Sequence, residues 1–219
     1  CYPKLNVKIV ATHGGITVGE DGASHQALED VSFMRSLPDM TVIIPSDYNE
    51  VKQAVKYALE IDGPCYIRVS RTNLKTVFDE NNYKFNPKSA VRLTEGPDVT
   101  IVTNGETLIE TINAAKFLEK DGIRAEILHI PVIKPFFAQD DLIKSAQKTK
   151  KVVTVENYSI IGGVGSLVCE TLSENYPVPV LRIGTNDCFG QSGEQRVLME
   201  YYGLTAEKLY EKIKNFIKK

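Results

Sequence analysis

The chain has 219 residues, which is enough for one large domain or two small ones. With 42% hydrophobic and 25% charged residues, its composition is that of a globular protein rather than a disordered one. The net charge of −2 argues against a nucleic-acid surface. No apolar stretch reaches the roughly 18 residues of a membrane span, so no membrane partner is expected.

Cysteine use and the first residue bear on the setting of the protein. The four cysteines lie far apart without a Cys-x-x-Cys pair, so we predict neither a metal site nor a disulfide framework. This use of cysteine predicts a cytoplasmic location. The chain begins with Cys1 rather than Met. We therefore expect a processed or excised part of a longer protein.

In the first part of the chain, β-branched segments alternate with amphipathic ones. Strands are predicted at residues 7–12 and 41–45, which are expected to be buried, and at residues 65–70, which alternate with period two. Two helices are predicted between them, capped by Ser24 and Ser46 and ended by Leu37 and Gly63.

The second part repeats this alternation after an irregular stretch, residues 72–97, which is predicted to be an interdomain linker. Strands are predicted at 98–103, 125–130, 151–155 and 178–183, and helices at 107–121, 163–174, 194–202 and from 205 onward. The pattern predicts an α/β protein with two three-layer α/β/α domains, residues 1–85 and 86–219, whose sheets are mainly parallel.

Polar side chains are predicted to converge where two strands of the first domain end. His13 follows the first strand, Asp21 and His25 belong to the glycine-rich segment before the next helix, and Arg71 ends the third strand. Ligands of open α/β sheets bind at this edge. A guanidinium and an imidazole suit a phosphate, a carboxylate suits hydroxyls, and a second imidazole can move protons. Their combined chemistry suits a sugar phosphate. From position alone, however, such residues are more often ordinary loop groups, so the order of the residues decides between the two interpretations.

The order of these residues resembles transketolase. The string from Thr12 to Gln26 reads T-H-G-G-I-T-V-G-E-D-G-A-S-H-Q and is followed by R-S-L-P, P-S-D, V-S-R and, near the end, G-L-T. More narrowly, it is similar to the C-terminal subunit of the two-subunit transketolases of prokaryotes. Ser24 departs from the commoner Thr. The resemblance covers essentially the whole chain, as the later half of a thiamine pyrimidine-binding domain followed by the Rossmann-like transketolase C-terminal domain.

The resemblance implies a thiamine-diphosphate-dependent transferase of the pentose phosphate pathway, which moves a two-carbon ketol unit between sugar phosphates. It implies that His13 and Arg71 bind the substrate phosphate, that Asp21 holds a hydroxyl of the donor sugar, and that His25 is the catalytic residue near the reacting carbonyl and the thiamine.

The resemblance also implies that this chain is incomplete as an enzyme. In the family, thiamine diphosphate and Mg²⁺ are held mainly by parts that do not match this sequence, including a glutamate on an earlier segment. An N-terminal transketolase subunit or domain and a second copy of the chain, as in a dimer, are therefore expected as partners.

Two alternatives stay open. One is an assembly or regulatory module without chemistry that docks to a catalytic partner, and the other is a related thiamine enzyme such as deoxyxylulose-phosphate synthase. Two further features are predicted to be structural. The glycines of residues 162–166 are expected to allow close packing of a helix on the sheet rather than nucleotide binding, and His129 is expected to be a hydrogen-bonded core residue.

Overall fold

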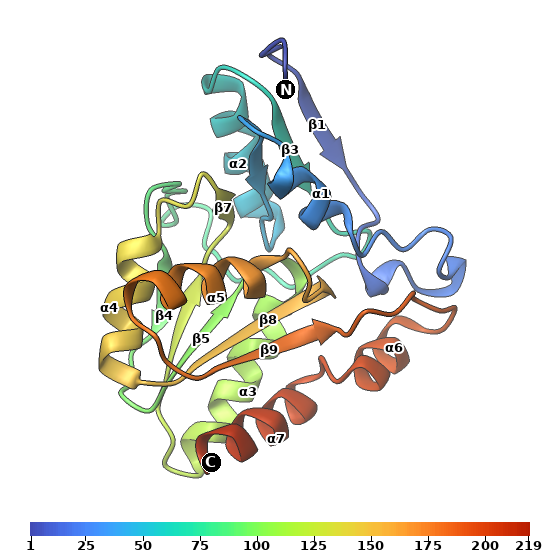
Figure 1. Ribbon diagram of the computed structural model, residues 1–219. Helices are drawn as coiled ribbons and strands as arrows, with labels where there is room; N and C mark the ends of the chain where they lie inside the picture. Colours follow the sequence, from blue (N-terminus) through green and yellow to red (C-terminus); the bar gives the residue numbers. More distant parts are fainter.

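The computed structural model describes residues 1–219, which form two sheets covered by helices (Figure 1). The first sheet has four strands in the order β1-β3-β2-β7, and the second has five in the order β4-β6-β5-β8-β9. Most neighbouring strands are parallel, and the two antiparallel pairs, β2 with β7 and β4 with β6, lie at sheet edges. The predicted α/β class is confirmed.

The first sheet centres on β3 (Cys65–Arg68), which pairs in parallel with β1 (Lys8–Ala11) and with β2 (Thr41–Ile43). Helix α1 (Asp30–Ser36) contributes Val31 to the core shared with one face of this sheet. Helix α2 (Tyr48–Glu60) covers the other face, where its small residues Ala54 and Ala58 pack among the strands. The fourth strand, β7 (Val132–Lys134), comes from far along the chain.

The second sheet is a three-layer unit. Its strands are β4 (Val91–Thr94), β5 (Val99–Thr103), β6 (Ala125–His129), β8 (Val152–Ser159) and β9 (Val180–Thr185). Its helices are α3 (Leu108–Lys120), α4 (Gln139–Thr149), α5 (Val164–Asn175), α6 (Gln195–Tyr202) and α7 (Ala206–Ile217). Helices α3 and α7 pack together on one face, and α4 and α5 pack together on the other.

Several predicted boundaries differ from the structure. Ser24 caps no helix, because α1 begins only at Asp30; the residues between them include Ala27, which forms a bridge with Gly14. Asp47, not Ser46, caps α2: its carboxylate accepts the backbone N–H of Glu50 at 2.9 Å. A carboxylate one residue later can meet the same unpaired N–H groups and adds a favourable interaction with the helix dipole.

Three elements were absent from the sequence prediction: β4, β7 and α4. Strand β4 lies inside the stretch predicted to be a linker, and β7, although it belongs to residues assigned to the second domain, completes the first sheet. Both lie at the edge of a sheet and pair antiparallel with a strand far along the chain, so they are identified by tertiary pairing rather than by a local pattern. Helix α4 starts without a capping side chain, which removes the usual signal for its first turn.

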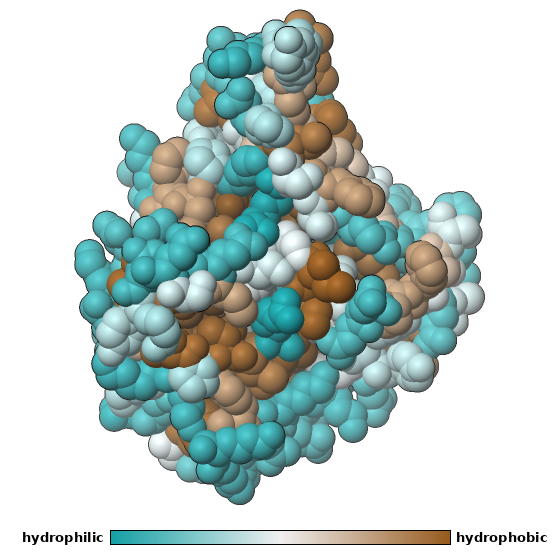
Figure 2. All heavy atoms as spheres, in the orientation of Figure 1, coloured by the Kyte–Doolittle hydropathy of each residue, from teal (hydrophilic) through white to brown (hydrophobic).

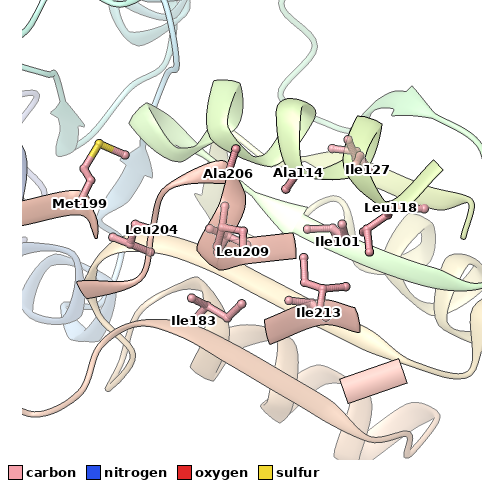
Figure 3. Close-up of a cluster of buried hydrophobic side chains, with 14 of the residues drawn as sticks. Ile101, Ala114, Leu118, Ile127, Ile183, Met199, Leu204, Ala206, Leu209 and Ile213 are labelled. Carbon is pink, nitrogen blue, oxygen red and sulfur yellow. The ribbon is translucent and has the colours of Figure 1, made fainter. Parts of the chain in front are cut away.

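The two sheets share their hydrophobic cores. One cluster combines Ile16, within the glycine-rich segment, and Leu28, just after it, with Ile101 of β5, Leu118 of α3 and other residues of the second sheet and its helices. Figure 3 shows the centre of this cluster, where residues of α3 and α7 meet β5 and β9. A second cluster joins Val42 and Tyr66 of the first sheet to residues of α4 and α5. The two halves therefore fold against one another as one body.

A buried hydrogen bond also connects the halves. His129, at the end of β6, lies 2.8 Å through Nε2 from the Glu50 carboxylate on α2, and both side chains are fully buried. The hydroxyl of Tyr83 donates to Oε1 of Glu50, and the ring of Phe78 packs on the imidazole. The prediction that His129 is a hydrogen-bonded core residue is confirmed.

Strand β1 leaves apolar side chains at the surface. Leu5, Val7, Ile9 and Val10 are all substantially exposed, and β1 is an edge strand of its sheet. Figure 2 shows brown residues along this side of the upper lobe. Edge strands are normally protected from further pairing by charges, bulges or a covering segment. This edge is therefore suited to contact with more polypeptide.

No helix of the chain combines the length and the apolar character that a membrane span requires.

The glycines of residues 162–166 pack against a buried carboxylate. A Cβ atom on Gly165 would lie 2.6 Å from Oε1 of Glu156, and a Cβ atom on Gly163 would overlap with its Oε2. The N–H of Gly165 donates to Oε1 of Glu156 at 3.1 Å. The predicted close packing of α5 on the sheet is confirmed. Burial raises the pKa of Glu156 to about 8 although backbone N–H groups and Arg182 favour its charged form.

We predict that the Glu156→Gln variant changes how stability depends on pH. Because the folded pKa lies above the unfolded value of about 4.3, folded wild type binds a proton that the unfolded chain lacks between about pH 4.5 and pH 8. Its free energy of unfolding therefore falls across this window as the pH rises. The Tm of the wild type relative to the variant should fall by about 2–4 °C or more between pH 5 and pH 8.5.

Glu126→Gln is the matched control, measured by the same calorimetric scans. The side chain of Glu126 is as buried as that of Glu156, and burial disfavours its charged form. Hydrogen bonds from Lys148 and Ser145 outweigh this effect and lower the pKa of Glu126. Because Glu126 is ionised in both states above pH 5, its replacement should give a nearly constant Tm difference from the wild type. Parallel curves for Glu156→Gln and wild type would contradict the assignment.

Candidate functional site

The site predicted from the sequence is built on the segment between β1 and α1, residues 13–26, which we call the glycine loop. It leaves β1 at His13, forms a 3-10 segment over Ile16–Asp21 and returns toward α1. Two glycines let it lie directly on the protein. A Cβ atom on Gly14 would be 2.5 Å from Nε of Arg68, and Gly15, with φ of 88°, leaves no room for a Cβ beside Asn157.

Two of the predicted site residues form an ion pair. NH1 of Arg71, which follows β3, lies 3.1 Å from Oδ2 of Asp21, and the two side chains are 38% and 42% exposed. The same NH1 donates to the carbonyl of Val18 in the glycine loop. The carboxylate and the guanidinium, for which separate roles are predicted, are thus side by side at the surface.

The two predicted imidazoles are exposed and oriented by neighbouring hydroxyls. Nδ1 of His13 lies 2.7 Å from Oγ1 of Thr12, and Nδ1 of His25 lies 3.0 Å from Oγ of Ser24. When the hydroxyl donates to Nδ1, the ring proton resides on Nε2, which then faces outward as a donor. Neither imidazole hydrogen-bonds to the Asp21–Arg71 pair. Of the four predicted residues, Asp21 and Arg71 therefore form a pair. His13 and His25 remain exposed on the glycine loop, which also contains Asp21.

A buried polar network supports the glycine loop from below. Arg68 of β3, 3% exposed, donates from Nε to Asp30 at 2.9 Å and from NH1 to Oδ1 of Asn157 at 2.7 Å. Asn157, on β8, donates to Oε2 of Glu106 at 2.9 Å, which also accepts from Thr17 of the loop. Burial raises the pKa of Glu106, although bonds from Ser70 and Thr17 and the charge of Arg68 favour ionisation. The network joins the loop to both sheets.

A second set of contacts comes from the segment after β9, residues 187–193. Oγ of Ser192 donates to the carbonyl of Glu20 at 2.6 Å, and the side-chain amide of Gln26 donates to the carbonyl of Gln191 at 3.0 Å. Figure 1 shows the loop lying beside this segment and α6. Sequence reasoning missed these residues. Gly190 and Gly193, which flank Gln191 and Ser192, are typical of a turn, but no residue pattern indicates which segment it contacts.

The donor set suits an anionic, hydroxylated ligand rather than a metal. No group of three or more His, Cys, Asp or Glu side chains lies together as a metal site would require. The surface of the loop instead offers one guanidinium, one carboxylate and two imidazole Nε2 atoms. A guanidinium binds phosphate or sulfonate oxygens through charge-assisted hydrogen bonds, and a carboxylate accepts from sugar hydroxyls.

Comparison with known families agrees with this arrangement along the chain. The family model of the transketolase pyrimidine-binding domain matches residues 2–76. The family model of the transketolase C-terminal domain matches residues 88–209. The first covers the glycine loop and Arg71, and the second covers most of the second sheet with its helices.

Individual relatives give the same result. A Methanocaldococcus jannaschii protein named "Putative transketolase C-terminal section" is 44% identical over 100% of this chain and 68% of its own length. A 6-deoxy-6-sulfo-D-fructose transketolase subunit of a Clostridium species is 44% identical over 95% of this chain and 64% of its own.

A solved structure is similar as well. A split-gene transketolase, described as an inactive beta4 tetramer, superposes with a TM-score of 0.92 at 45% identity and covers 100% of this chain and 69% of that one. The chain thus spans about two thirds of the length of these relatives. It belongs to the transketolase family and corresponds to the C-terminal section of those enzymes.

Proposed function

We propose that this chain, together with an N-terminal transketolase subunit or domain, transfers a two-carbon ketol unit from a ketose phosphate to an aldose phosphate. Family membership supports the reaction class. The observation that carries the assignment to this chain is the glycine loop, which places Asp21 beside Arg71 and leaves Nε2 of His13 and Nε2 of His25 without a hydrogen-bond partner on the same loop.

Recognition of the substrate phosphate is assigned to Arg71 and His13. The ion pair of Arg71 with Asp21 is about 40% exposed on each side, and such surface pairs contribute only about 0–1 kcal/mol. A phosphate dianion, which accepts two parallel N–H bonds, can therefore replace the carboxylate on the guanidinium. Nε2 of His13 adds a second donor. The carboxylate of Asp21 is then free to accept a hydrogen bond from a sugar hydroxyl.

Proton movement at the reacting carbonyl is assigned to His25, the proposed catalytic residue. Its Nδ1 is engaged by Ser24, which leaves Nε2 to donate to, or accept from, an oxygen of the substrate. Because His25 is on the same loop as Asp21, binding of the sugar hydroxyl would place the carbonyl relative to the imidazole.

The cofactor proposed is thiamine diphosphate, as the pyrimidine-binding domain implies. When bound, thiamine diphosphate supplies the carbanion chemistry that breaks and forms the carbon–carbon bond. Of the residues of this chain, His25 is proposed to lie near the thiamine. Mg²⁺ and the diphosphate are proposed to be held by the N-terminal partner.

The proposed partners are the N-terminal subunit and a second copy of this chain. The chain spans 68% of its Methanocaldococcus relative, and the split-gene relative is described as a tetramer of β chains that is inactive. The exposed apolar residues along β1 fit contact with further polypeptide. We propose a cytoplasmic location and a role in the pentose phosphate pathway; the free state of all four cysteines supports the reducing setting.

We predict that the chain alone has no transketolase activity and gains it when mixed with an N-terminal transketolase subunit, thiamine diphosphate and Mg²⁺. The physical reason is that no residue cluster here holds the metal. A coupled assay of aldose release from a ketose phosphate measures this. Substantial turnover by the chain alone would contradict the division of labour, and saturable binding of the ketose phosphate to the chain would separate an enzyme part from a pure docking module.

We predict that Arg71→Ala in the reconstituted enzyme lowers kcat/KM for a ketose phosphate about 10- to 100-fold, mainly through KM. This range corresponds to loss of a hydrogen bond to a charged group, worth about 1.5–3 kcal/mol. The same ketose without phosphate should change less than about threefold, because it has no anion for Arg71 to bind.

Arg124→Ala, which removes an exposed arginine in the turn before β6, is the control and should leave both rates unchanged. Equal losses on the phosphorylated and unphosphorylated sugars would refute a phosphate role for Arg71. A sulfonated ketose as a third substrate tests whether the site also binds a terminal anion other than phosphate.

A further inference from the structure

Gln26 follows directly after His25 and is buried inside the turn that the glycine loop makes, with 5% of its surface exposed. Its Nε2 lies 3.2 Å from the carbonyl oxygen of Ile16, 3.4 Å from that of Gly19 and 3.0 Å from that of Gln191. Two of these acceptors belong to the loop itself, and the third belongs to the segment after β9. One amide thus connects the two ends of the loop with the second sheet.

The orientation of this amide is fixed by its surroundings. Three carbonyl oxygens surround Nε2, so a flipped amide would place its oxygen against three other acceptors. Oε1 is buried without a hydrogen-bond partner, and it faces Gly190, where a Cβ atom would overlap with it. An unpaired buried oxygen costs free energy. Gln26 therefore acts as a hydrogen-bond donor at this site, and the absence of a Cβ atom at Gly190 makes room for its Oε1.

The position of these contacts relates them to the predicted chemistry. Ile16 and Gly19 lie in the 3-10 segment that ends with Asp21, so the amide sets the separation between that segment and the backbone next to His25. Ser192 adds a bond from the same external segment to the carbonyl of Glu20, next to Asp21. The residues expected to contact the sugar are thus held from behind by the second half of the chain.

We propose that Gln26 is a positioning residue for the transfer reaction: its amide, braced by residues 190–192, fixes Asp21 and His25 at the spacing that the sugar and the reacting carbonyl require. This inference rests on the proposed function of the loop. It also gives the C-terminal domain a part in the site, because residues 190–192 belong to that domain. Misplacement of about 1 Å at such groups can cost about 100-fold in rate.

The test uses Gln26→Glu, which keeps the size of the side chain and removes the amide donor. Gln53→Glu is the matched control, because the amide of Gln53 also bonds a backbone carbonyl, that of Tyr83 at 2.8 Å, but lies on α2 away from the loop. Gly190→Ala is a second variant that leaves Gln26 intact and displaces its amide. If Gln26→Glu does not fold, Gly190→Ala still tests the position of the amide.

Two measurements are made. Amide hydrogen exchange on the chain alone reports the order of residues 14–25, and kcat and KM with fructose 6-phosphate report the reconstituted enzyme. We expect Gln26→Glu and Gly190→Ala to raise exchange in residues 14–25 at least about fivefold, with exchange in β5 and β8 unchanged. We also expect kcat to fall at least about tenfold, since a displaced His25 slows the chemistry rather than binding alone. Gln53→Glu should do neither.

The outcomes separate this inference from the proposed function. Unchanged exchange in the loop, or increased exchange with a wild-type kcat, overturns the positioning role. A general rise in exchange across both sheets also overturns it, because Gln26 would then serve stability alone. If wild type reconstituted with the partner shows no transfer, the proposed function fails, and the exchange measurement still decides whether Gln26 orders the loop.

Discussion

The contact between the two halves of this protein depends on the buried guanidinium of Arg68. A charge removed from water is tolerated only when it is paired and hydrogen-bonded, and Arg68 obtains its partners from separate parts of the chain: Asp30 on α1 and Asn157 on β8. The ring of Tyr158 lies under the same guanidinium. Because the glycine loop packs directly on this group, the loop can take its observed course only when both sheets are in place.

Much of the fold could be predicted from the sequence because its signals are local. Strand β5 is a run of β-branched residues, β3 follows directly after Gly63 and Pro64, and α2 and α7 have one apolar stripe each. These patterns identify the element without knowledge of its neighbours. The strands β4 and β7 could not be found in this way, because each is an edge strand whose pairing partner is far along the chain. The placement of β7 in the first sheet is a tertiary effect.

The candidate site shows the same division between local and distant information. His13, Asp21, His25 and Arg71 could be selected because residue type, position after a strand and order within a known family pattern agree. The ion pair between Asp21 and Arg71 could not, since it depends on how the loop folds back toward β3. Glu106, Asn157 and Ser192 gave no signal at all. Each is an ordinary polar residue whose role appears only when a segment of the other half is brought against it.

The crossing of β7 into the first sheet has a consequence for how the chain acquires its structure during synthesis. Strands β1, β2 and β3 are translated before β7. Until residue 134 has emerged, the outer edge of β2 has no neighbour and the core residues around Val42 stay in water. The first sheet can therefore be completed only after three strands of the second sheet, β4, β5 and β6, have been translated.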